Sequence, residues 1–333
     1  MQSDMDLSVI IVSWNVADLL AACLDSIASA PVTLAGLNGT RHGTGPLVAE
    51  VIVVDSASQD GTADIIRERY PWARLMPQGE NIGFTRGNNL GLAAARGRHM
   101  LLLNPDTVVQ DDALNRLIEY LDHNPAVGMA GPRVLNTDGT TQSTRRRFPT
   151  RVTALFESTW LQGYAPRRLL ERFYVADQPD DGTFDVDWVQ GCALIARREV
   201  YEQIGGLDAG YVMFSEELDW CRRAKGAGWR VAYVGDAVIT HHGGKSTEQV
   251  EAQKHVYFQQ SKLRYFRTYH GRAFAFVLRV FLLLSYGAQL AMEVVKAILG
   301  SKRPMRRARI ATYAQVIRAL AFTVRPASGD NTT

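Results

Sequence analysis

The sequence has few cysteines, and they form no recognisable framework. Its three cysteines, Cys23, Cys192 and Cys221, are far apart, and no Cys-x-x-Cys pair occurs. This spacing excludes a small disulfide-stabilised scaffold and argues against a zinc site. A chain of 333 residues, of which 46% are hydrophobic, is instead long enough to bury its own core as one large or two modest domains in a reducing cytoplasm.

The sequence also lacks a targeting signal and a long apolar run. Residues Met1 to Asp6 are acidic and lead directly into an apolar strand, so we expect no secretory signal. The apolar region 274–299 has its longest uncharged stretch from Val280 to Met292, thirteen residues, whereas about 20 are needed to span a bilayer. We therefore do not expect a simple membrane crossing.

Acidic residues are almost absent from the C-terminal part of the chain. Between His255 and Arg325, thirteen Lys or Arg residues accompany a single acid, Glu293, which gives a net charge of +12 and leaves −9 of the total of +3 for the remainder. This segment contains no recognisable nucleic-acid-binding motif, so nucleic acid is not the expected partner.

The same C-terminal segment has an amphipathic pattern. At 100° per residue, its polar side chains fall within an arc of about 120°, opposite a wide apolar face. The polar residues are Arg279, Ser285, Gln289, Glu293 and Lys296. Periodicity alone allows, nearly as well, a helix packed on the rest of the chain or in a homo-oligomer. The flanking cations favour residues 260–325 at the anionic inner face of the cytoplasmic membrane.

Short apolar runs alternate with helical patterns in the first half of the chain. Runs at 7–13, 51–55, 74–76 and 100–103 indicate strands of a parallel sheet wound with helices. Further short strands are expected at 128–133, 229–233 and 236–239, and an exposed loop at 36–46. Segment 140–181 shows no clean period, and its structure stays open.

Two of the early strands end in a carboxylate, Asp55 and Asp106. Ligands of open α/β sheets bind at the carboxyl edge, and an Asp there suits a hard divalent cation that carries a diphosphate. Taken alone, Asn104-Pro-Asp-Thr107 favours a simple turn that leads to the next helix. Gly83 and Gly87 follow at the start of a helix, where the lack of a Cβ would let a ring or phosphate approach the backbone.

Glu216 and Glu217 occupy the first turn of a later helix. Acids in that position interact favourably with the helix dipole, which is the ordinary explanation. Adjacent acids also point in different directions, so one can act as a general base while the other braces a loop. His241 and His242 follow on a strand, where an imidazole serves either the core or a divalent metal.

Together these motifs resemble glycosyltransferase family 2, and within it the bacterial rhamnosyltransferase group. The resemblance covers residues 7 to 247 in the order of the family, and the ordered set is specific although no single motif is. The matching segments are Val12–Asn15, Val54–Gly61, Asn81–Asn89, Asn104–Asp106, Gly191, Gly206–Asp208, Glu216–Asp219 and His241–Ser246.

The resemblance implies a GT-A fold, a wound mixed α/β sheet that performs inverting sugar transfer from a nucleotide-diphosphate donor. Its domains would be a catalytic domain at 1–250 and a basic helical extension at 251–333. Within the catalytic domain, about 1–135 would bind the nucleotide sugar and 136–250 would provide the acceptor and catalytic part.

Each site residue takes its expected role from the resemblance. Donor contacts are Ser13, Asn15, Asp55, Asn81, Gly83, Asn88 and Asp106. Asp106 would hold Mg²⁺ or Mn²⁺, and His241, or else His242, would be the second protein contact to the metal or the leaving phosphate. Glu217 matches the catalytic base, Glu216 its neighbour and Asp219 a supporting carboxylate. Trp188 and Gly191 would lie on the acceptor side.

The chain departs from the family at two points, and the donor stays open. The metal motif has Asn at 104, and Glu216-Glu217 replaces the usual Glu-Asp, so either glutamate could be the base.

The subgroup favours dTDP-L-rhamnose as donor over UDP-hexoses or UDP-galactofuranose, and a glycan or polyprenyl-diphosphate-linked saccharide as acceptor in cell-envelope polysaccharide synthesis. The alternatives are a non-catalytic nucleotide-sugar-binding protein and a nucleotidyltransferase. The latter usually has a Gly-rich, Lys/Arg-bearing phosphate loop, which Val12–Asn15 is not.

Overall fold

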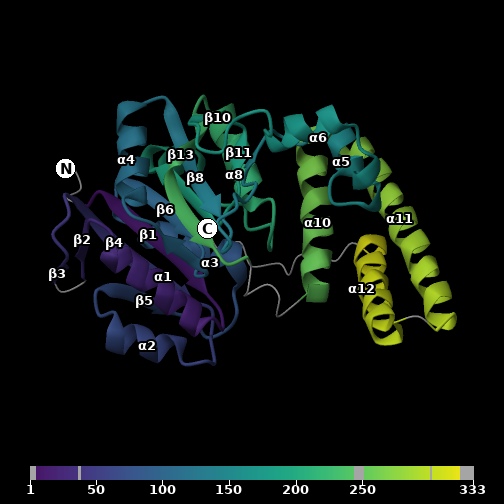
Figure 1. Ribbon diagram of the computed structural model, residues 1–333, viewed down its shortest axis with the longest axis horizontal. Helices are drawn as coiled ribbons and strands as arrows, with labels where there is room; N and C mark the ends of the chain where they lie inside the picture. Colours follow the sequence, from purple (N-terminus) through teal and green to yellow (C-terminus); the bar gives the residue numbers. More distant parts are fainter. Residues whose placement is uncertain (1–4, 37–38, 244–250, 301, 323–333) are drawn as a thin grey trace, which may run out of the picture. The chain divides into compact units, whose positions relative to one another are not determined.

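The computed structural model describes residues 5–36, 39–243, 251–300 and 302–322. The chain clusters into two compact units (Figure 1). The first, called the sheet unit, comprises Met1–Phe148, Glu171–Ala209 and Glu216–Gln249. The second, called the helical unit, comprises Pro149–Leu170, Gly210–Ser215 and Val250–Thr333. The helical unit thus includes two segments that a boundary at residue 250 would assign to the catalytic domain.

A mixed sheet of eleven strands forms the centre of the sheet unit, as expected for the α/β class. Its strands are β1 (Leu7–Ser13), β2 (Val32–Ala35), β3 (Arg41–His42), β4 (Leu47–Asp55), β5 (Ala73–Pro77), β6 (His99–Leu103), β7 (Thr107–Val109), β8 (Val127–Leu135), β10 (Phe184–Val186), β12 (Ala193–Arg197) and β13 (Arg230–His241). The order is β10-β13-β8-β12-β6-β1-β4-β2-β3, with β5 paired to β4 and β7 to β13. Strands β6, β1, β4, β2 and β5 run parallel, so their carboxyl ends share one edge.

Helices cover this sheet because each presents a stripe of apolar side chains. They are α1 (Ala17–Ser29), α2 (Thr62–Arg69), α3 (Gly83–Ala94), α4 (Ala113–His123), α7 (Arg198–Ile204) and α8 (Glu216–Gly226). Helix α1 buries Leu20, Leu24 and Ile27, which lie on one helical face at i, i+4 and i+7. Strand β1 is buried at all seven positions, which explains its continuous apolar run.

Gly87 has a packing role in place of the expected ligand contact. A Cβ at this position would lie 2.8 Å from Cγ1 of Val12, and a Cβ at Gly91 would lie 2.2 Å from Cγ2 of Ile10. Both distances are far below van der Waals contact, so the two glycines allow α3 to pack directly on β1. The expectation of a ligand over the backbone of Gly87 is therefore wrong, because a strand side chain occupies that space.

Two other expectations differ from the structure. The stretch 36–46 is only partly a loop, because Arg41 of β3 pairs with Ala35 of β2 in an antiparallel hairpin. The two strands expected at 229–233 and 236–239 form the single strand β13, with a register shift between Val234 and Val238. Such an irregularity bends a strand without ending it, so it resembles a break in the sequence pattern.

Segment 140–181 contains several short elements, which explains its lack of a period. They are β9 (Arg145–Arg146), α5 (Arg151–Phe156), the 3₁₀ helix η1 (Trp160–Tyr164) and α6 (Arg167–Tyr174). Strand β9 pairs with β11 (Trp188–Val189) in a separate two-stranded sheet. Elements of two to eight residues are too short to reveal a hydrophobic period.

Three long helices, α10 (Glu251–His270), α11 (Arg272–Ile298) and α12 (Arg303–Ala321), dominate the helical unit (Figure 1). Helix α11 is joined to α12 by an ion pair of 2.6 Å between Glu293 and Arg306. Within the part of the chain that the structure describes, α11 is the one helix long and apolar enough to cross a membrane, and 22% of its most apolar 18-residue window is buried.

Candidate active site

The parallel strands bring three of the expected donor contacts to one edge of the sheet. Ser13 and Asp55 are the last residues of β1 and β4 and face each other in the register. Strand β6 lies on the other side of β1 and ends at Leu103, so Asp106 follows three residues beyond the same edge. Residues that are 93 positions apart in the sequence are therefore close in the fold.

Ser13 and Asp55 place buried polar atoms at this edge. Both side chains are buried, and among the described residues Ser13 Oγ and Asp55 Oδ1 have no hydrogen-bond partner. The other carboxylate oxygen of Asp55 accepts a hydrogen bond of 3.3 Å from the backbone N–H of Ser58. An unsatisfied buried polar atom costs about 1–3 kcal/mol, which a ribose hydroxyl or base amide at this edge would offset.

Asn15 connects the two loops that follow β1 and β4. Its side-chain Oδ1 accepts a hydrogen bond of 2.8 Å from the N–H of Gln59, and its own N–H donates to Ser58 Oγ at 2.9 Å. The residue has φ +51°, which asparagine tolerates better than most side chains. These contacts fix the shape of the edge beside Asp55.

Asn81, Gly83 and Asn88 shape the start of α3. Asn81 Oδ1 accepts a hydrogen bond of 3.0 Å from the N–H of Gly83, which has φ +77° and begins the helix. Asn88 is buried, and its Nδ2 donates to the carbonyl of Phe84 at 3.0 Å, one turn earlier. These three residues therefore hold the α3 N-terminus in place, and their expected contact with the donor stays a prediction.

Asp106 and His241 form a close pair beyond the sheet edge. Strands β7 and β13 are antiparallel and place His241 opposite Thr107, so that His241 Nε2 lies 3.2 Å from Asp106 Oδ1. Asn104 Nδ2 lies 3.4 Å from the same nitrogen. His242 meets Asp106 through the backbone, its N–H donating to the Asp106 carbonyl at 2.9 Å. Gly244–Ser246, which end this motif, lie outside the described residues.

Gln142 orients His241, and the sequence pattern did not identify it. Its Oε1 lies 3.0 Å from His241 Nδ1, and its Nε2 donates to the His241 carbonyl at 2.8 Å. When the imidazole donates from Nδ1 to this oxygen, Nε2 is left with its lone pair directed toward Asp106. Gln142 lies in the segment without a period, 99 residues before its partner, so no local pattern could have identified it.

The pair fits a divalent cation by its chemistry. A carboxylate oxygen of Asp106 and an imidazole nitrogen of His241 lie 3.2 Å apart, and Asn104 Oδ1 is buried without a hydrogen-bond partner in the described part of the chain. The described residues contain no group of three or more His, Cys, Asp or Glu side chains suited to a metal. A cation here would therefore depend on diphosphate oxygens and water for most of its coordination, as Mg²⁺ commonly does.

Glu216 and Glu217 begin α8, Glu216 buried and Glu217 half-buried. Burial, with the charge of Glu217 second, raises the pKa of Glu216 well above its ordinary value. Burial also raises the pKa of Glu217, while backbone N–H groups, including those of Gly191 and Leu218, lower it. Two neighbouring carboxyls disfavour simultaneous ionisation, and Glu217, which receives more backbone stabilisation, is the more readily ionised of the two.

Asp219 has a positioning role in this structure. Its Oδ2 accepts a hydrogen bond of 2.7 Å from Arg223 Nε, and Arg223 in turn donates to the carbonyls of Ile204 and Gly206. Asn89 of α3 holds the next residue of that loop, with one hydrogen bond to the N–H and one to the carbonyl of Leu207. The loop 204–207 is thereby fixed between α3 and α8.

Gly191 and Cys192 are adjacent residues that contact Glu217 on one side and the segment Asn104–Asp106 on the other. A Cβ at Gly191 would lie 3.6 Å from Cβ of Glu217, and the carbonyl of Cys192 accepts a hydrogen bond of 2.9 Å from the N–H of Asn104. Burial first, then the charge of Asp106, raises the pKa of Cys192 to about 12, and the charge of Glu217 contributes as well. The two carboxylates therefore both lie near one buried thiol.

Trp188 is a structural neighbour of this segment. Its side chain is buried, and its indole N–H donates to the carbonyl of Arg147 at 3.1 Å. The bond joins β11 to the chain beyond β9, which places Gln190 and Gly191 beside α8. An acceptor-side role for Trp188 and Gly191 stays a prediction.

Comparison with known proteins shows which family this chain matches. The model of the family described as Glycosyl transferase family 2 matches residues 8–205. The chain is 29% identical over 208 residues to an N-acetylglucosaminyl-diphospho-decaprenol L-rhamnosyltransferase of Mycobacterium tuberculosis, covering 59% of this chain and 67% of that protein. It is 24% identical to rhamnosyltransferase WbbL of Escherichia coli, covering 55% of this chain and 69% of that one.

Solved structures share the fold at low identity. A mannosyltransferase of Pyrobaculum calidifontis in complex with GDP-Man and Mn²⁺ has a TM-score of 0.54 at 17% identity, covering 96% of this chain and 88% of its own. GalNAc-T7 with UDP, GalNAc and Mn²⁺ has a TM-score of 0.52 at 14% identity, covering 73% and 44%. These similarities confirm the GT-A fold with a helical C-terminal region.

Proposed function

This chain belongs to glycosyl transferase family 2, with rhamnosyltransferases among its relatives, and we propose that it transfers L-rhamnose from dTDP-L-rhamnose, with inversion, to a glycan or polyprenyl-diphosphate-linked saccharide. The observation that carries the proposal is the junction at Gly191–Cys192. There the Glu217 side chain lies against Gly191, and the Asp106 motif is bonded to Cys192. An inverting displacement needs a base on one side of the anomeric carbon and a stabilised leaving group on the other.

In the proposed reaction, Glu217 acts as the base, and Asp106 and His241 act at the leaving diphosphate. A carboxylate oxygen of Glu217 accepts the proton of the acceptor hydroxyl, whose oxygen attacks the anomeric carbon opposite the diphosphate. The bond from that carbon to the diphosphate oxygen breaks, and the nucleoside diphosphate departs. Asp106 and His241 would hold Mg²⁺ or Mn²⁺, which supplies positive charge against the leaving diphosphate. Both structural neighbours were solved with Mn²⁺, which supports this assignment.

The glutamate pair supports Glu217 as the base and Glu216 as its neutral neighbour. Glu216 is 4% exposed, and burial raises its pKa more strongly than that of Glu217, which favours the proton on Glu216. A protonated Glu216 does not repel the carboxylate of Glu217, and it cannot itself accept a proton. Asp219 accepts a hydrogen bond from Arg223, which fixes α8 and thus the positions of Glu216 and Glu217.

The donor assignment is tested by a panel of nucleotide sugars. Purified full-length protein, Mn²⁺ or Mg²⁺ and a lipid-linked saccharide acceptor are combined with dTDP-L-rhamnose, UDP-hexoses or UDP-galactofuranose, and release of nucleoside diphosphate is measured. We expect release from dTDP-L-rhamnose. Release from a UDP-sugar alone would replace the proposed donor. Binding of nucleotide without release from any donor would identify a non-catalytic nucleotide-sugar-binding protein.

The outward face of α11 supports attachment to the cytoplasmic membrane. The polar stripe of this helix faces inward: Ser285 and Glu293 are buried, and Arg279 Nε donates to the Leu320 carbonyl at 2.6 Å. The opposite face, an arc of about 100° along the helix, is apolar and exposed, which inverts the pattern of a soluble helix. Its large side chains are Phe276, Val277, Val280, Leu284, Val295 and Ile298.

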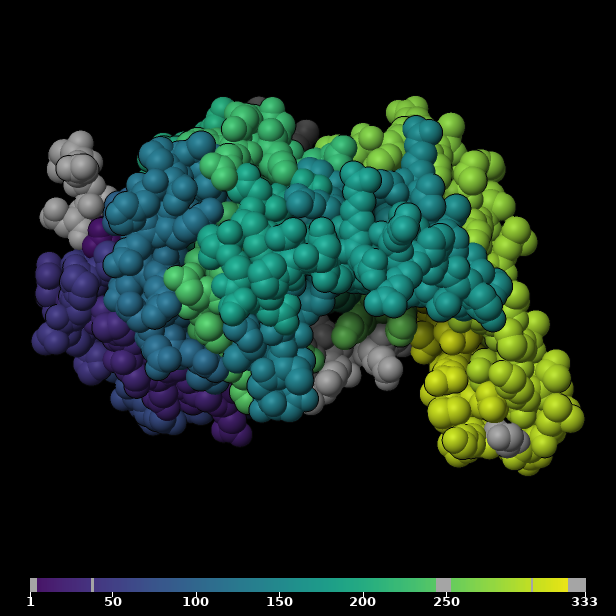
Figure 2. Space-filling model, turned by 45° about the horizontal axis from the view of Figure 1, so that its top comes forward, coloured from purple at the N-terminus to yellow at the C-terminus, as the bar shows by residue number. Residues whose placement is uncertain are grey.

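Basic residues flank this apolar face. Arg267 and Arg272 are exposed before it, and Lys302, Arg303 and Arg307 after it. In Figure 2 the yellow-green atoms of α11 form an outer edge of the helical unit. Cations near an anionic bilayer contribute about 1 kcal/mol each, and buried apolar side chains add to this. We therefore assign the helical unit to the inner membrane surface, where a lipid-linked acceptor is found.

Replacing Leu284 and Ile298 with aspartate is expected to reduce binding to anionic liposomes by roughly 10²-fold or more. Burying each side chain in the bilayer would otherwise contribute about 2–3 kcal/mol. Their exposed fractions are 69% and 73%, so the change leaves the interior of the unit intact. Co-sedimentation measures the effect, with Gln315→Asp, an exposed position of α12, as the control for added negative charge. Equal sedimentation of both variants, with loss of self-association in the double variant, would assign the face to a homo-oligomer instead.

A further inference from the structure

A cavity of about 480 Å³ lies within the helical unit, and the transfer reaction as described above does not use it. Its volume is in the range of small-molecule pockets, about 300–1,000 Å³. Five segments line it: residues 158–160 after α5 up to the start of η1, Phe214 before α8, the facing sides of α10 and α11, and Tyr313 of α12. All of these belong to one compact unit.

Five aromatic residues, Trp160, Phe214, Phe258, Tyr286 and Tyr313, belong to the cavity wall. Phe214 and Phe258 pack edge to face with their centroids 5.6 Å apart, and Tyr286 and Tyr313 do the same at 5.6 Å. Trp160, also in the wall, is 53% exposed. Flat aromatic walls favour an apolar ligand with planar unsaturated groups, against which rings pack face to face or edge to face.

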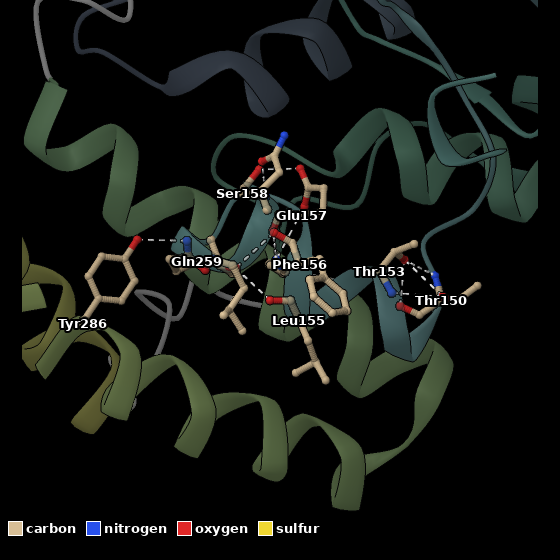
Figure 3. A network of polar contacts seen from close by, with 12 residues as sticks. Thr150, Thr153, Leu155, Phe156, Glu157, Ser158, Gln259 and Tyr286 are labelled. Atoms are coloured by element: carbon tan, nitrogen blue, oxygen red, sulfur yellow. Dashed lines mark hydrogen bonds and ion pairs between the residues drawn. The ribbon is translucent and has the colours of Figure 1, made fainter. Parts of the chain in front are cut away.

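Polar groups line the cavity from α10 and from the segments around it. Lys254 and His255 lie one turn before Phe258 and Gln259 on α10, while Ser158, Thr159, Ser285 and Gln289 come from the other segments. Gln259 is 2% exposed; its Nε2 donates to the hydroxyl of Tyr286 at 3.1 Å (Figure 3), and its Oε1 has no hydrogen-bond partner among the described residues. An orphaned buried acceptor of this kind indicates a ligand or a bound water that carries a donor.

Helix α10 also fixes the two wall segments that come from elsewhere in the chain. Ser261 Oγ donates to the carbonyl of Met213 at 2.8 Å, beside Phe214, and Lys262 Nζ donates to the carbonyl of Glu157 at 2.7 Å, beside Ser158. Phe214 and Ser215 have φ +69° and +65°, a conformation that non-glycine residues adopt only under constraint. Hydrogen bonds from α10 therefore hold the cavity wall in place. Phe214 in that wall precedes the start of α8 by two residues.

We infer that this cavity binds the phosphate-proximal isoprenoid units of a polyprenyl-linked acceptor. The aromatic walls suit a branched chain with a planar double bond in every unit, and Lys254 and His255 suit its phosphate. A water or phosphate hydroxyl would satisfy Gln259 Oε1. Leu282, Ser285, Tyr286 and Gln289 of α11 line the cavity, while the opposite face of the same helix is the exposed apolar one. One helix would thus separate the bound chain from the bilayer.

The test uses farnesyl phosphate as a soluble probe and calorimetry on the full chain in solution. Gln289→Trp places an indole in the cavity, and Ala288→Trp places the same side chain on the exposed face one residue earlier. We expect Gln289→Trp to weaken binding at least tenfold and Ala288→Trp to leave it within twofold. Trp160→Ala, which trims the wall at a half-exposed position, is a second cavity variant that does not depend on accommodating a larger side chain.

This inference rests on the proposed transferase function, and the two can fail separately. Binding of farnesyl phosphate is measured without any donor, whereas transfer is measured with a saccharide acceptor that lacks the lipid. In the cavity variants the KM for lipid-linked acceptor should rise while the KM for the nucleotide sugar stays constant. Unchanged farnesyl phosphate affinity in both cavity variants would overturn the inference. So would competition by dodecyl phosphate at equal affinity, which would assign the cavity to a phospholipid chain.

Discussion

Replacing Asp106 with alanine is expected to abolish turnover and to weaken Mn²⁺-dependent binding of the nucleoside diphosphate on the order of 10²-fold or more. Asp106 is 2% exposed, and with His241 it provides the proposed protein contacts to the cation. Removing the carboxylate leaves the imidazole as the sole proposed protein ligand, and a neutral nitrogen holds a hard cation weakly. Titration calorimetry with the nucleoside diphosphate, with and without Mn²⁺, measures the change.

Two comparisons separate the metal role from a structural one. Asp106→Asn keeps the shape of the side chain and removes its charge, so it should lose metal-dependent binding nearly as completely. The thermal unfolding temperature without nucleotide and metal should change little in Asp106→Asn, because the fold would use the shape and hydrogen bonds of this side chain. Unchanged affinity for the nucleoside diphosphate with Mn²⁺ in the alanine variant would exclude Asp106 as a metal contact.

The carboxyl edge of the sheet could be predicted from the amino-acid sequence alone. Buried parallel strands are continuous apolar runs, and parallel strands deliver their last residues to one edge, so the pattern of the chain suffices to group Asp55 and Asp106, while the family resemblance adds Ser13. The pairing of β1 with β4 and β6 confirms this grouping. Their roles in binding the donor stay predictions.

The contacts that hold the site in shape could not be predicted, because they join residues far apart without a local pattern. Gln142 reaches His241 across 99 positions, and Asn89 reaches Leu207 across 118. Periodicity also could not tell which face of α11 is buried. The arc of polar residues was visible, but only the contact of Arg279 with Leu320 and the ion pair of Glu293 show that it faces inward.

The extent of the helical unit also could not be predicted from the sequence. Segments 149–170 and 210–215 cluster with the C-terminal helices although the chain continues from each into the sheet unit. They are held by hydrogen bonds from Ser261 and Lys262 to backbone carbonyls, which any residue type can offer. Backbone carbonyls are the same in every residue type, so the amino-acid composition does not show which of them accept these bonds. A domain boundary derived from charge and hydrophobicity therefore cannot include such segments.

Changing Glu217 to glutamine is expected to lower kcat by about 10²–10⁴-fold while donor binding is retained. Glutamine is nearly isosteric and can keep the contact with Gly191, but it cannot accept the proton of the acceptor hydroxyl. Since burial raises the pKa of Glu217, kcat/KM of the native chain should fall with decreasing pH at values above those of an ordinary glutamate. The residual activity of the glutamine variant should lack this acid limb.

Glu216→Gln is the matched control on the adjacent residue. A glutamine there mimics the neutral form that Glu216 adopts beside a charged Glu217, so kcat should fall by less than in Glu217→Gln and the acid limb should persist. Steady-state rates of the two variants between about pH 5 and 9, at saturating donor and about 0.15 M salt, provide the comparison. If Glu216→Gln instead caused the larger loss and removed the acid limb, Glu216 would be the base and Glu217 its charged neighbour.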